Sequence, residues 1–216
     1  MSESPEIQES ISRLSTHWST MALEGTTDCA RVDASLRAQR MRFETFILNH
    51  DLQGKSILDV GCGVGDFWAH LQARGIKCDY LGVDIAPEMI RRSRERFPQA
   101  NFEERNILEW EPGRSFDFAV SFGIHSFKVP NKLDLLTAMT RRKFELCSVA
   151  AHTTILTDRY QKFGPEAQFF NPEEVLTVTL AITPWVVLRH DYLPNDISYT
   201  LYRRPLIETK TGLMLD

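Results

Sequence analysis

Short apolar runs alternate along the chain with longer segments in which apolar residues recur every three or four positions. Runs bounded by turn residues are typical of buried strands, and the three-to-four spacing is typical of helices with one buried face. The predicted strands are 56–60, 78–83, 101–104, 116–122, 148–156, 186–190 and 198–203. The predicted helices are 7–23, 33–49, 67–74, 87–97, 131–146 and 171–182. Strands that alternate with helices indicate a parallel sheet covered by helices on both faces.

Residues that start and stop helices fall at these boundaries. Asp33 is a good N-cap for the second helix, and Asn171 is a good N-cap for the last. The segment 193–196 reads Leu-Pro-Asn-Asp, which is a turn signal between the last two strands. So short a connection requires those two strands to be antiparallel. The predicted fold class is α/β, with a doubly wound, mostly parallel seven-stranded sheet and a C-terminal antiparallel hairpin.

The stretch 57–66, Ile-Leu-Asp-Val-Gly-Cys-Gly-Val-Gly-Asp, joins the first predicted strand to a helix. Gly61, Gly63 and Gly65 stand at alternate positions. Glycine permits the positive φ of a sharp turn and lets a ligand lie against bare main chain. Asp84 follows the next apolar run, 21 residues after Gly63. Doubly wound folds present a carboxylate to ribose hydroxyls at about this distance, so the pattern predicts a nucleoside-binding corner.

Two residues narrow the class of nucleoside. Asp66 stands where a dinucleotide-binding fingerprint has its third glycine, so NAD and FAD fit poorly. A P-loop is excluded because no Gly-Lys-Ser/Thr ends the turn. Asp59 adds a carboxylate that would repel a pyrophosphate. The corner therefore suits a ligand that carries positive charge and no phosphate.

These residues resemble a known family. The run Asp-Val-Gly-Cys-Gly-Val-Gly over 59–65 and the run Leu-Gly-Val-Asp-Ile-Ala-Pro-Glu-Met-Ile over 81–90 are similar to the first two signatures of class I S-adenosylmethionine-dependent methyltransferases. The resemblance covers roughly residues 40–205. It implies a Rossmann-like methyltransferase fold, S-adenosyl-L-methionine as cofactor, and in-line methyl transfer to a small-molecule nucleophile. It also implies a helical lid over residues 1–50 and a methyltransferase domain over 51–216.

The resemblance assigns most of the cofactor site to the two signatures. Gly61, Cys62 and Gly63 would pass the amino-acid and ribose portions along the main chain. Asp59 would face the positive end of the cofactor, directly or through water. Asp84 is expected to accept hydrogen bonds from both ribose hydroxyls, the alternative being a surface acid that follows a strand. The side chain that packs on the adenine would be Ile85.

Two further segments are matched to the adenine and to the cofactor's carboxylate. Asn106 falls where the family often has an aspartate for the adenine amino group, and an asparagine carbonyl can accept the same hydrogen bond. A plain turn asparagine is the alternative. Ile107 is expected to contact the ring through its backbone. Arg42 precedes a phenylalanine, an arrangement with which some small methyltransferases reach the cofactor's carboxylate, and Arg40 is the neighbouring alternative.

The segment 121–125, Ser-Phe-Gly-Ile-His, follows a predicted strand and occupies the fourth signature of the family. The carboxyl end of such a strand lies near the switch point of the sheet, so Ser121 and His125 are expected to line the pocket. An imidazole there can act as a general base for a hydroxyl. The alternative is a histidine that only binds or shapes the acceptor. His17 and Trp18 are expected to form part of the lid.

Composition and charge limit the partners. The chain of 216 residues has a formal net charge of −4, which argues against nucleic acid as a partner, and local basic runs such as 141–143 do not change that balance. The apolar runs are too short for a membrane partner. The four cysteines show no metal-binding spacing, so no metal is expected, and they favour a reducing, cytoplasmic compartment. Neither the acceptor's nucleophilic atom nor an oligomeric state is indicated.

Two functions of other classes are kept open. The chain would be an accessory protein that binds S-adenosylmethionine or S-adenosylhomocysteine without catalysis if no acceptor were ever methylated. It would be a nucleotide-dependent oxidoreductase if it bound a nicotinamide cofactor. Asp66, which stands in place of a glycine, argues against this alternative.

Overall fold

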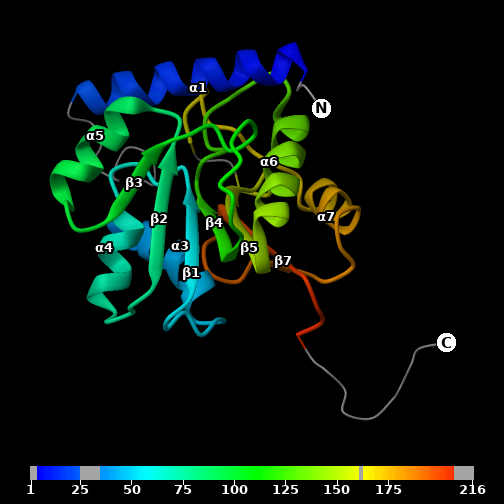
Figure 1. The fold of residues 1–216 in the computed structure, drawn as a ribbon. Coiled ribbons are helices and arrows are strands. Elements are labelled where there is room, and N and C mark those ends of the chain that lie inside the picture. Colours follow the sequence, from blue (N-terminus) through cyan, green and yellow to red (C-terminus); the bar gives the residue numbers. More distant parts are fainter. Residues whose placement is uncertain (1–3, 25–34, 161–162, 207–216) are drawn as a thin grey trace, which may run out of the picture.

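The computed structural model describes residues 4–24, 35–160 and 163–206. In these residues helices lie on both faces of a seven-stranded sheet (Figure 1). The strands are β1 (Ser56–Val60), β2 (Asp79–Asp84), β3 (Asn101–Glu104), β4 (Phe116–Phe122), β5 (Cys147–Leu156), β6 (Val186–Arg189) and β7 (Asp196–Tyr202). The helices are α1 (Pro5–Leu23), α3 (Leu36–Ile47), α4 (Asp66–Ala73), α5 (Pro87–Arg96), α6 (Lys132–Leu146) and α7 (Pro172–Leu180).

The sheet order is β3-β2-β1-β4-β5-β7-β6. Strands β1 to β5 run parallel, whereas β7 is antiparallel to both β5 and β6. The mostly parallel sheet and its C-terminal antiparallel hairpin are therefore confirmed. Strand β1 pairs with β2 on one side and with β4 on the other, so the chain reverses its direction of winding beside β1. Ligands of doubly wound folds bind at the carboxyl ends of the strands at such a switch point.

The two faces of the sheet carry separate cores. Ile57 packs toward α3, α4 and α5, in a cluster that contains Phe46 and Phe67. Its neighbour Leu58 packs toward α6 and α7, in a cluster that contains Leu136. Successive side chains of a strand point to opposite faces, so a continuously apolar strand is what a doubly covered sheet needs.

Helix α1 crosses the end of the sheet at which the parallel strands finish (Figure 1). Two serine hydroxyls fasten it there. Ser15 Oγ donates to the carbonyl oxygen of Ile85 at 2.8 Å, and Ser10 Oγ donates to Asn131 Oδ1 at 2.6 Å.

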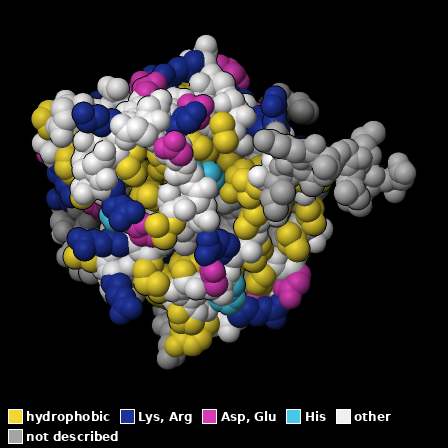
Figure 2. Space-filling model, turned by 90° about the horizontal axis from the view of Figure 1, so that it is seen from below, with side chains coloured by type: hydrophobic (Ala, Val, Ile, Leu, Met, Phe, Trp, Pro, Cys, Tyr) yellow, Lys and Arg dark blue, Asp and Glu magenta, His cyan; other side chains and the backbone are white. Residues whose placement is uncertain are grey.

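Figure 2 shows the opposite end of the molecule, where basic, acidic and apolar side chains are interspersed. None of the helices in the described segments combines the length and the apolar character of a bilayer span.

Helix boundaries differ slightly from the predictions. Helix α1 begins two residues before the predicted Ile7, because Ser4 serves as its N-cap. Helix α3 begins at Leu36, and Ser35 Oγ accepts a hydrogen bond from the N–H of Ala38 at 3.1 Å. Asp33, the predicted cap of that helix, lies outside the described residues.

The cap of α7 is confirmed. Asn171 Oδ1 accepts hydrogen bonds from the main-chain N–H groups of Glu173 and Glu174 at 2.9 and 3.2 Å. These are donors that the first turn of a helix leaves unpaired.

Candidate functional site

The glycine turn that follows β1 has the sharp geometry that its sequence predicts. Gly61, Gly63 and Gly65 have φ angles of 71°, 53° and 85°. The N–H of Gly61 donates to the carbonyl oxygen of Val83 at 2.7 Å, which fastens the turn to β2. A Cβ on Gly61 would lie 2.1 Å from Cγ2 of Ile124, so the loop that follows β4 packs directly against the bare main chain of Gly61. The turn therefore forms a close backbone floor.

Asp59, on β1, presents a buried carboxylate beside this turn. Its side chain is 2% exposed, and the Tyr80 hydroxyl donates a hydrogen bond to Asp59 Oδ2 at 2.7 Å. Burial, with a smaller contribution from the nearby Asp84, raises the pKa of Asp59 to about 7, against the opposing effect of the Tyr80 hydrogen bond. A cationic ligand would offset the energetic cost of ionising this buried carboxylate, because a nearby opposite charge favours the ionised form.

Asp84, at the end of β2, is held against the turn by main-chain donors. The N–H of Gly63 donates to Asp84 Oδ2 and the N–H of Ala86 donates to Asp84 Oδ1, both at 2.9 Å. Burial raises the pKa of this carboxyl, and the two N–H donors oppose the rise. The carboxylate is thus oriented before any ligand arrives, and its remaining lone pairs can accept hydroxyl donors.

A cavity of about 180 Å³ opens between the strand ends and α1. Most of the sequence-predicted site residues line it, namely Asp59, Gly61, Cys62, Gly63, Asp84, Ile85, Asn106, Ile107 and His125. The helices contribute wall residues that the sequence did not single out, namely Ile11, Leu14, Gln39, Leu135 and Met139. Trp18 of α1, which was predicted to be part of the lid, also lines this cavity.

Arg42 does not line the cavity, although its neighbours Gln39 and Phe43 do. Its side chain is 2% exposed and forms two hydrogen bonds of 2.8 Å with the two carboxylate oxygens of Asp196. The role predicted for Arg42, contact with the cofactor's carboxylate, does not fit this placement, because its guanidinium already pairs with a buried carboxylate. The neighbouring alternative, Arg40, is exposed.

Ser121 also lies outside the cavity wall. Its side chain is fully buried, and the ammonium of Lys143 donates a hydrogen bond to Ser121 Oγ. The same ammonium donates to Thr153 Oγ1 and to the carbonyl oxygen of His152. Burial lowers the pKa of Lys143 to about 7. Lys143 belongs to a basic run on a helix, so no local signal reveals that this side chain enters the core.

His125, the predicted catalytic histidine, lies in the wall of the cavity. The ring is 3% exposed and lines the cavity, and its Nε2 has no hydrogen-bond partner among the described residues. Burial, together with the smaller effect of the Lys143 charge, lowers the pKa of His125 to about 3. The imidazole is therefore neutral near pH 7.

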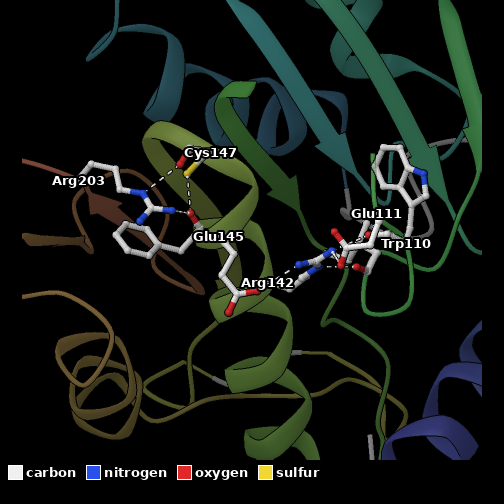
Figure 3. A network of polar contacts seen from close by, with 8 residues as sticks. Trp110, Glu111, Arg142, Glu145, Cys147 and Arg203 are labelled. Carbon is white, nitrogen blue, oxygen red and sulfur yellow. Dashed lines mark hydrogen bonds and ion pairs between the residues drawn. The ribbon is translucent and has the colours of Figure 1, made fainter. Parts of the chain in front are cut away.

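The segment after β3 contributes Arg105, Asn106 and Ile107 to the wall of the cavity. Asn106 Oδ1 accepts a hydrogen bond from the main-chain N–H of Leu108 at 3.2 Å. This contact is that of a turn asparagine, which was the alternative to a role in binding the adenine. The carbonyl oxygen of Ile107 accepts a hydrogen bond from Nε of Arg142 at 3.0 Å. Figure 3 shows Arg142 reaching from α6 to this segment, where it also pairs with Glu111 Oε1 at 2.7 Å. Arg142 supports this part of the cavity wall, and the sequence did not indicate that role.

Comparison with known proteins identifies a methyltransferase domain in the chain. A family model described as a methyltransferase domain matches residues 57–142. A protein of Mycobacterium tuberculosis named as a methyltransferase is 34% identical over 110 residues, which cover 45% of this chain and 65% of that protein. The trans-aconitate 2-methyltransferase of Escherichia coli is 36% identical over 124 residues, which cover 57% of this chain and 38% of that enzyme. The chain thus spans less than two thirds of the length of these relatives.

Solved structures share the fold. Magnesium protoporphyrin IX methyltransferase from Synechocystis PCC 6803, with bound S-adenosylmethionine, has a TM-score of 0.69 at 12% identity, covering 94% of this chain and 100% of that one. The complex of DhpI with S-adenosylhomocysteine has a TM-score of 0.67 at 17% identity, covering 92% and 97%. The chain therefore carries a methyltransferase domain on the fold of the class I S-adenosylmethionine-dependent methyltransferase family.

Proposed function

We propose that this protein is an S-adenosylmethionine-dependent methyltransferase that transfers a methyl group in line to a small-molecule nucleophile. One observation carries the proposal. The backbone turn over Gly61–Gly65 lies between two buried carboxylates, Asp59 and Asp84, in a single cavity. The named activities of the relatives, methyl transfer to trans-aconitate and to magnesium protoporphyrin IX, support a small-molecule acceptor.

The residues of the cavity fit the cofactor's charge and shape. Asp59 is buried and accepts a hydrogen bond from the Tyr80 hydroxyl, and S-adenosylmethionine carries both an ammonium and a sulfonium that its carboxylate can face. Gly61 and Gly63 leave the main chain open to the amino-acid and ribose portions. Asp84 is oriented to accept from ribose hydroxyls, and Ile85 lines the cavity where the adenine would pack. Asn106 and Ile107 would contact the ring's edge.

When bound, the cofactor supplies a methyl group that its sulfonium already activates. The chain must then orient the acceptor and exclude water, and such positioning supplies roughly 7–11 kcal/mol of a reaction barrier. Ile11, Leu14 and Trp18 of α1 cover the cavity as an apolar lid. This role agrees with our proposal that residues 1–50 form a lid region on a methyltransferase domain over 51–216.

We assign His125 to the acceptor. Its neutral ring has an unused Nε2 in the cavity wall, so it can accept the hydrogen bond of a hydroxyl, thiol or amine and orient that nucleophile. A pKa of about 3 makes the ring a weak base, so we assign it orientation of the acceptor and not removal of its proton. We also propose a cytoplasmic protein that does not bind nucleic acid. The net charge of −4 supports the second statement, and the free thiols of Cys62, Cys78 and Cys147 support the first.

Calorimetric titration with S-adenosylhomocysteine tests the cofactor site. We expect micromolar binding to the wild type and a loss of at least about tenfold in Asp84→Ala, since removing one good hydrogen-bonding group costs on the order of 1.4 kcal/mol. Asp79→Ala is the matched control, because Asp79 begins the same strand but is exposed and lies outside the cavity. Absence of binding to the wild type would refute the proposal. Binding without methyl transfer to any acceptor would instead support a non-catalytic binding protein.

A further inference from the structure

We propose that the methyl acceptor is a flat, apolar molecule without negative charge, which binds in a second cavity between α1 and the 163–167 loop. This inference rests on the proposed methyltransferase function and names its substrate class. The second cavity has a volume of about 300 Å³, at the lower end of small-molecule sites. Trp18 lines both cavities, so the second lies directly beside the first.

The walls of the second cavity are mainly aromatic and aliphatic. Its apolar lining consists of Trp18, Met21, Phe127, Leu156, Phe163, Pro165 and Ala167. The ring of His17 stacks on Phe127, with centroids 3.9 Å apart and planes inclined by 23°. Trp18 meets the edge of the same histidine at 4.9 Å. Flat faces of this kind favour a planar guest, because aromatic rings gain energy by stacking and edge contacts.

The charges around both cavities disfavour an anion. The acidic side chains that line them are Asp59, Asp66, Asp84 and Glu166. Among the described lining residues, Arg105 is the one lysine or arginine, and it pairs with Glu103 at 3.0 Å. Burial lowers the pKa of His17, so its ring does not supply a positive charge near pH 7. A carboxylate placed here would be desolvated without a cationic partner, which is costly.

One loop contributes residues to both cavities. His125 lines the first and Ser126 lines the second, so consecutive residues of one loop face both. The Nε2 atom of His125 is buried and has no partner among the described residues. A single hydroxyl, thiol or amine on an otherwise apolar guest would satisfy it. The acceptor class is therefore a planar apolar molecule with one nucleophilic heteroatom, unlike the tricarboxylate named for the trans-aconitate relatives.

Binding of three probes tests the inference. Each is titrated calorimetrically into the protein saturated with S-adenosylhomocysteine, and methylation is then followed by mass spectrometry with S-adenosylmethionine. The probes are 2-naphthol, 6-hydroxy-2-naphthoate, which adds one carboxylate to the same ring, and trans-aconitate. We expect 2-naphthol to bind at least about tenfold more tightly than either anion, the cost of one poorly compensated charge.

Substitutions assign the effect to this cavity. Phe127→Ala should weaken 2-naphthol binding at least about tenfold, because it removes one stacking wall, and leave S-adenosylhomocysteine binding unchanged. Glu166→Lys should raise the affinity for the naphthoate. Glu9→Lys is the matched control. This substitution makes the same change of charge at an exposed position on α1 that lines neither cavity.

The outcomes separate the two proposals. Failure of S-adenosylhomocysteine to bind would refute the proposed function, and the acceptor class with it. If S-adenosylhomocysteine binds but trans-aconitate or the naphthoate binds as tightly as 2-naphthol, the acceptor class is wrong and the function stands. The same holds if none of the three probes binds, or if Phe127→Ala leaves 2-naphthol binding unchanged.

Discussion

Arg42 and Asp196 form a buried bidentate ion pair between α3 and the first residue of β7, with both hydrogen bonds at 2.8 Å. The two residues are 154 positions apart in the sequence. The pair joins the N-terminal helical region to the antiparallel end of the sheet. Removing one partner would leave the other charge buried without this ion pair.

We therefore expect Arg42→Met and Asp196→Asn each to lower the free energy of unfolding by about 3–5 kcal/mol, the cost of breaking a buried ion pair. Chemical denaturation measures the change. Arg114→Met is the control, because it breaks an exposed pair with Asp79 and should cost about 1 kcal/mol or less. If Arg42→Met lost cofactor affinity while keeping full stability, Arg42 would instead be a cofactor-binding residue.

Asp59 should make both stability and cofactor binding depend on pH. Its pKa of about 7 in the folded chain lies above the ordinary value of 3.8. The contribution of this group to stability is therefore fully present below about pH 4 and is lost as the pH rises through 7. A cationic ligand favours the ionised carboxylate, so affinity for S-adenosylmethionine should increase over the same interval.

Unfolding and titration series between pH 4 and 8 check this prediction about Asp59. Asp59→Asn keeps the shape of the side chain and should flatten its contribution to both curves. A variant whose pH curves matched those of the wild type would show that another group titrates.

Gly61→Ala should be more damaging than an equivalent change elsewhere. It introduces a Cβ 2.1 Å from Cγ2 of Ile124, at a φ of 71°. We expect a loss of roughly 2–4 kcal/mol in the free energy of unfolding, from the clash and the left-handed backbone together. Gly113 has nearly the same φ, 68°, but an added Cβ there would meet open space. Gly113→Ala should therefore lose only the part of the unfolding free energy that comes from the left-handed backbone. The double variant Gly61→Ala with Ile124→Ala should recover part of the difference.

His125 should not titrate between pH 5 and 8. Its pKa is lowered to about 3, so the ring stays neutral throughout that range. If it orients the acceptor by accepting its hydrogen bond, His125→Ala should reduce kcat/KM about tenfold, the equivalent of one lost hydrogen bond. Binding of S-adenosylhomocysteine should be unchanged. NMR titration of the imidazole tests the first statement, and single-turnover kinetics test the second. A ring that became charged near pH 6.5 would contradict the burial of His125 near Lys143.

Arg142 should influence the cofactor through the wall that it supports. Its guanidinium bonds to the carbonyl oxygen of Ile107 and to Glu111 (Figure 3). Arg142→Ala should weaken S-adenosylhomocysteine about tenfold by releasing this segment, the equivalent of one lost hydrogen bond. Arg142→Lys should recover only part of the affinity, since lysine cannot reproduce the forked geometry. An unchanged dissociation constant in Arg142→Ala would show that the segment holds its position unaided.

The sequence by itself determined the elements and the centre of the site. Strand and helix positions follow from local periodicity, and Gly61, Gly63 and Asp84 act through a turn and a strand end whose geometry is local. Most residues assigned to the cofactor therefore meet in one cavity. Local patterns suffice here because the switch point of a doubly wound sheet always brings these segments together.

Only the tertiary structure decided which charged side chains are available to a ligand. Arg42 pairs with a carboxylate from the far end of the chain, and Lys143 of a basic run turns into the core. The second cavity likewise forms between α1 and a loop that follows β5. The physical reason is that the partner of a buried charge, and the closure of a lid, depend on packing between segments distant in sequence, which no local periodicity encodes.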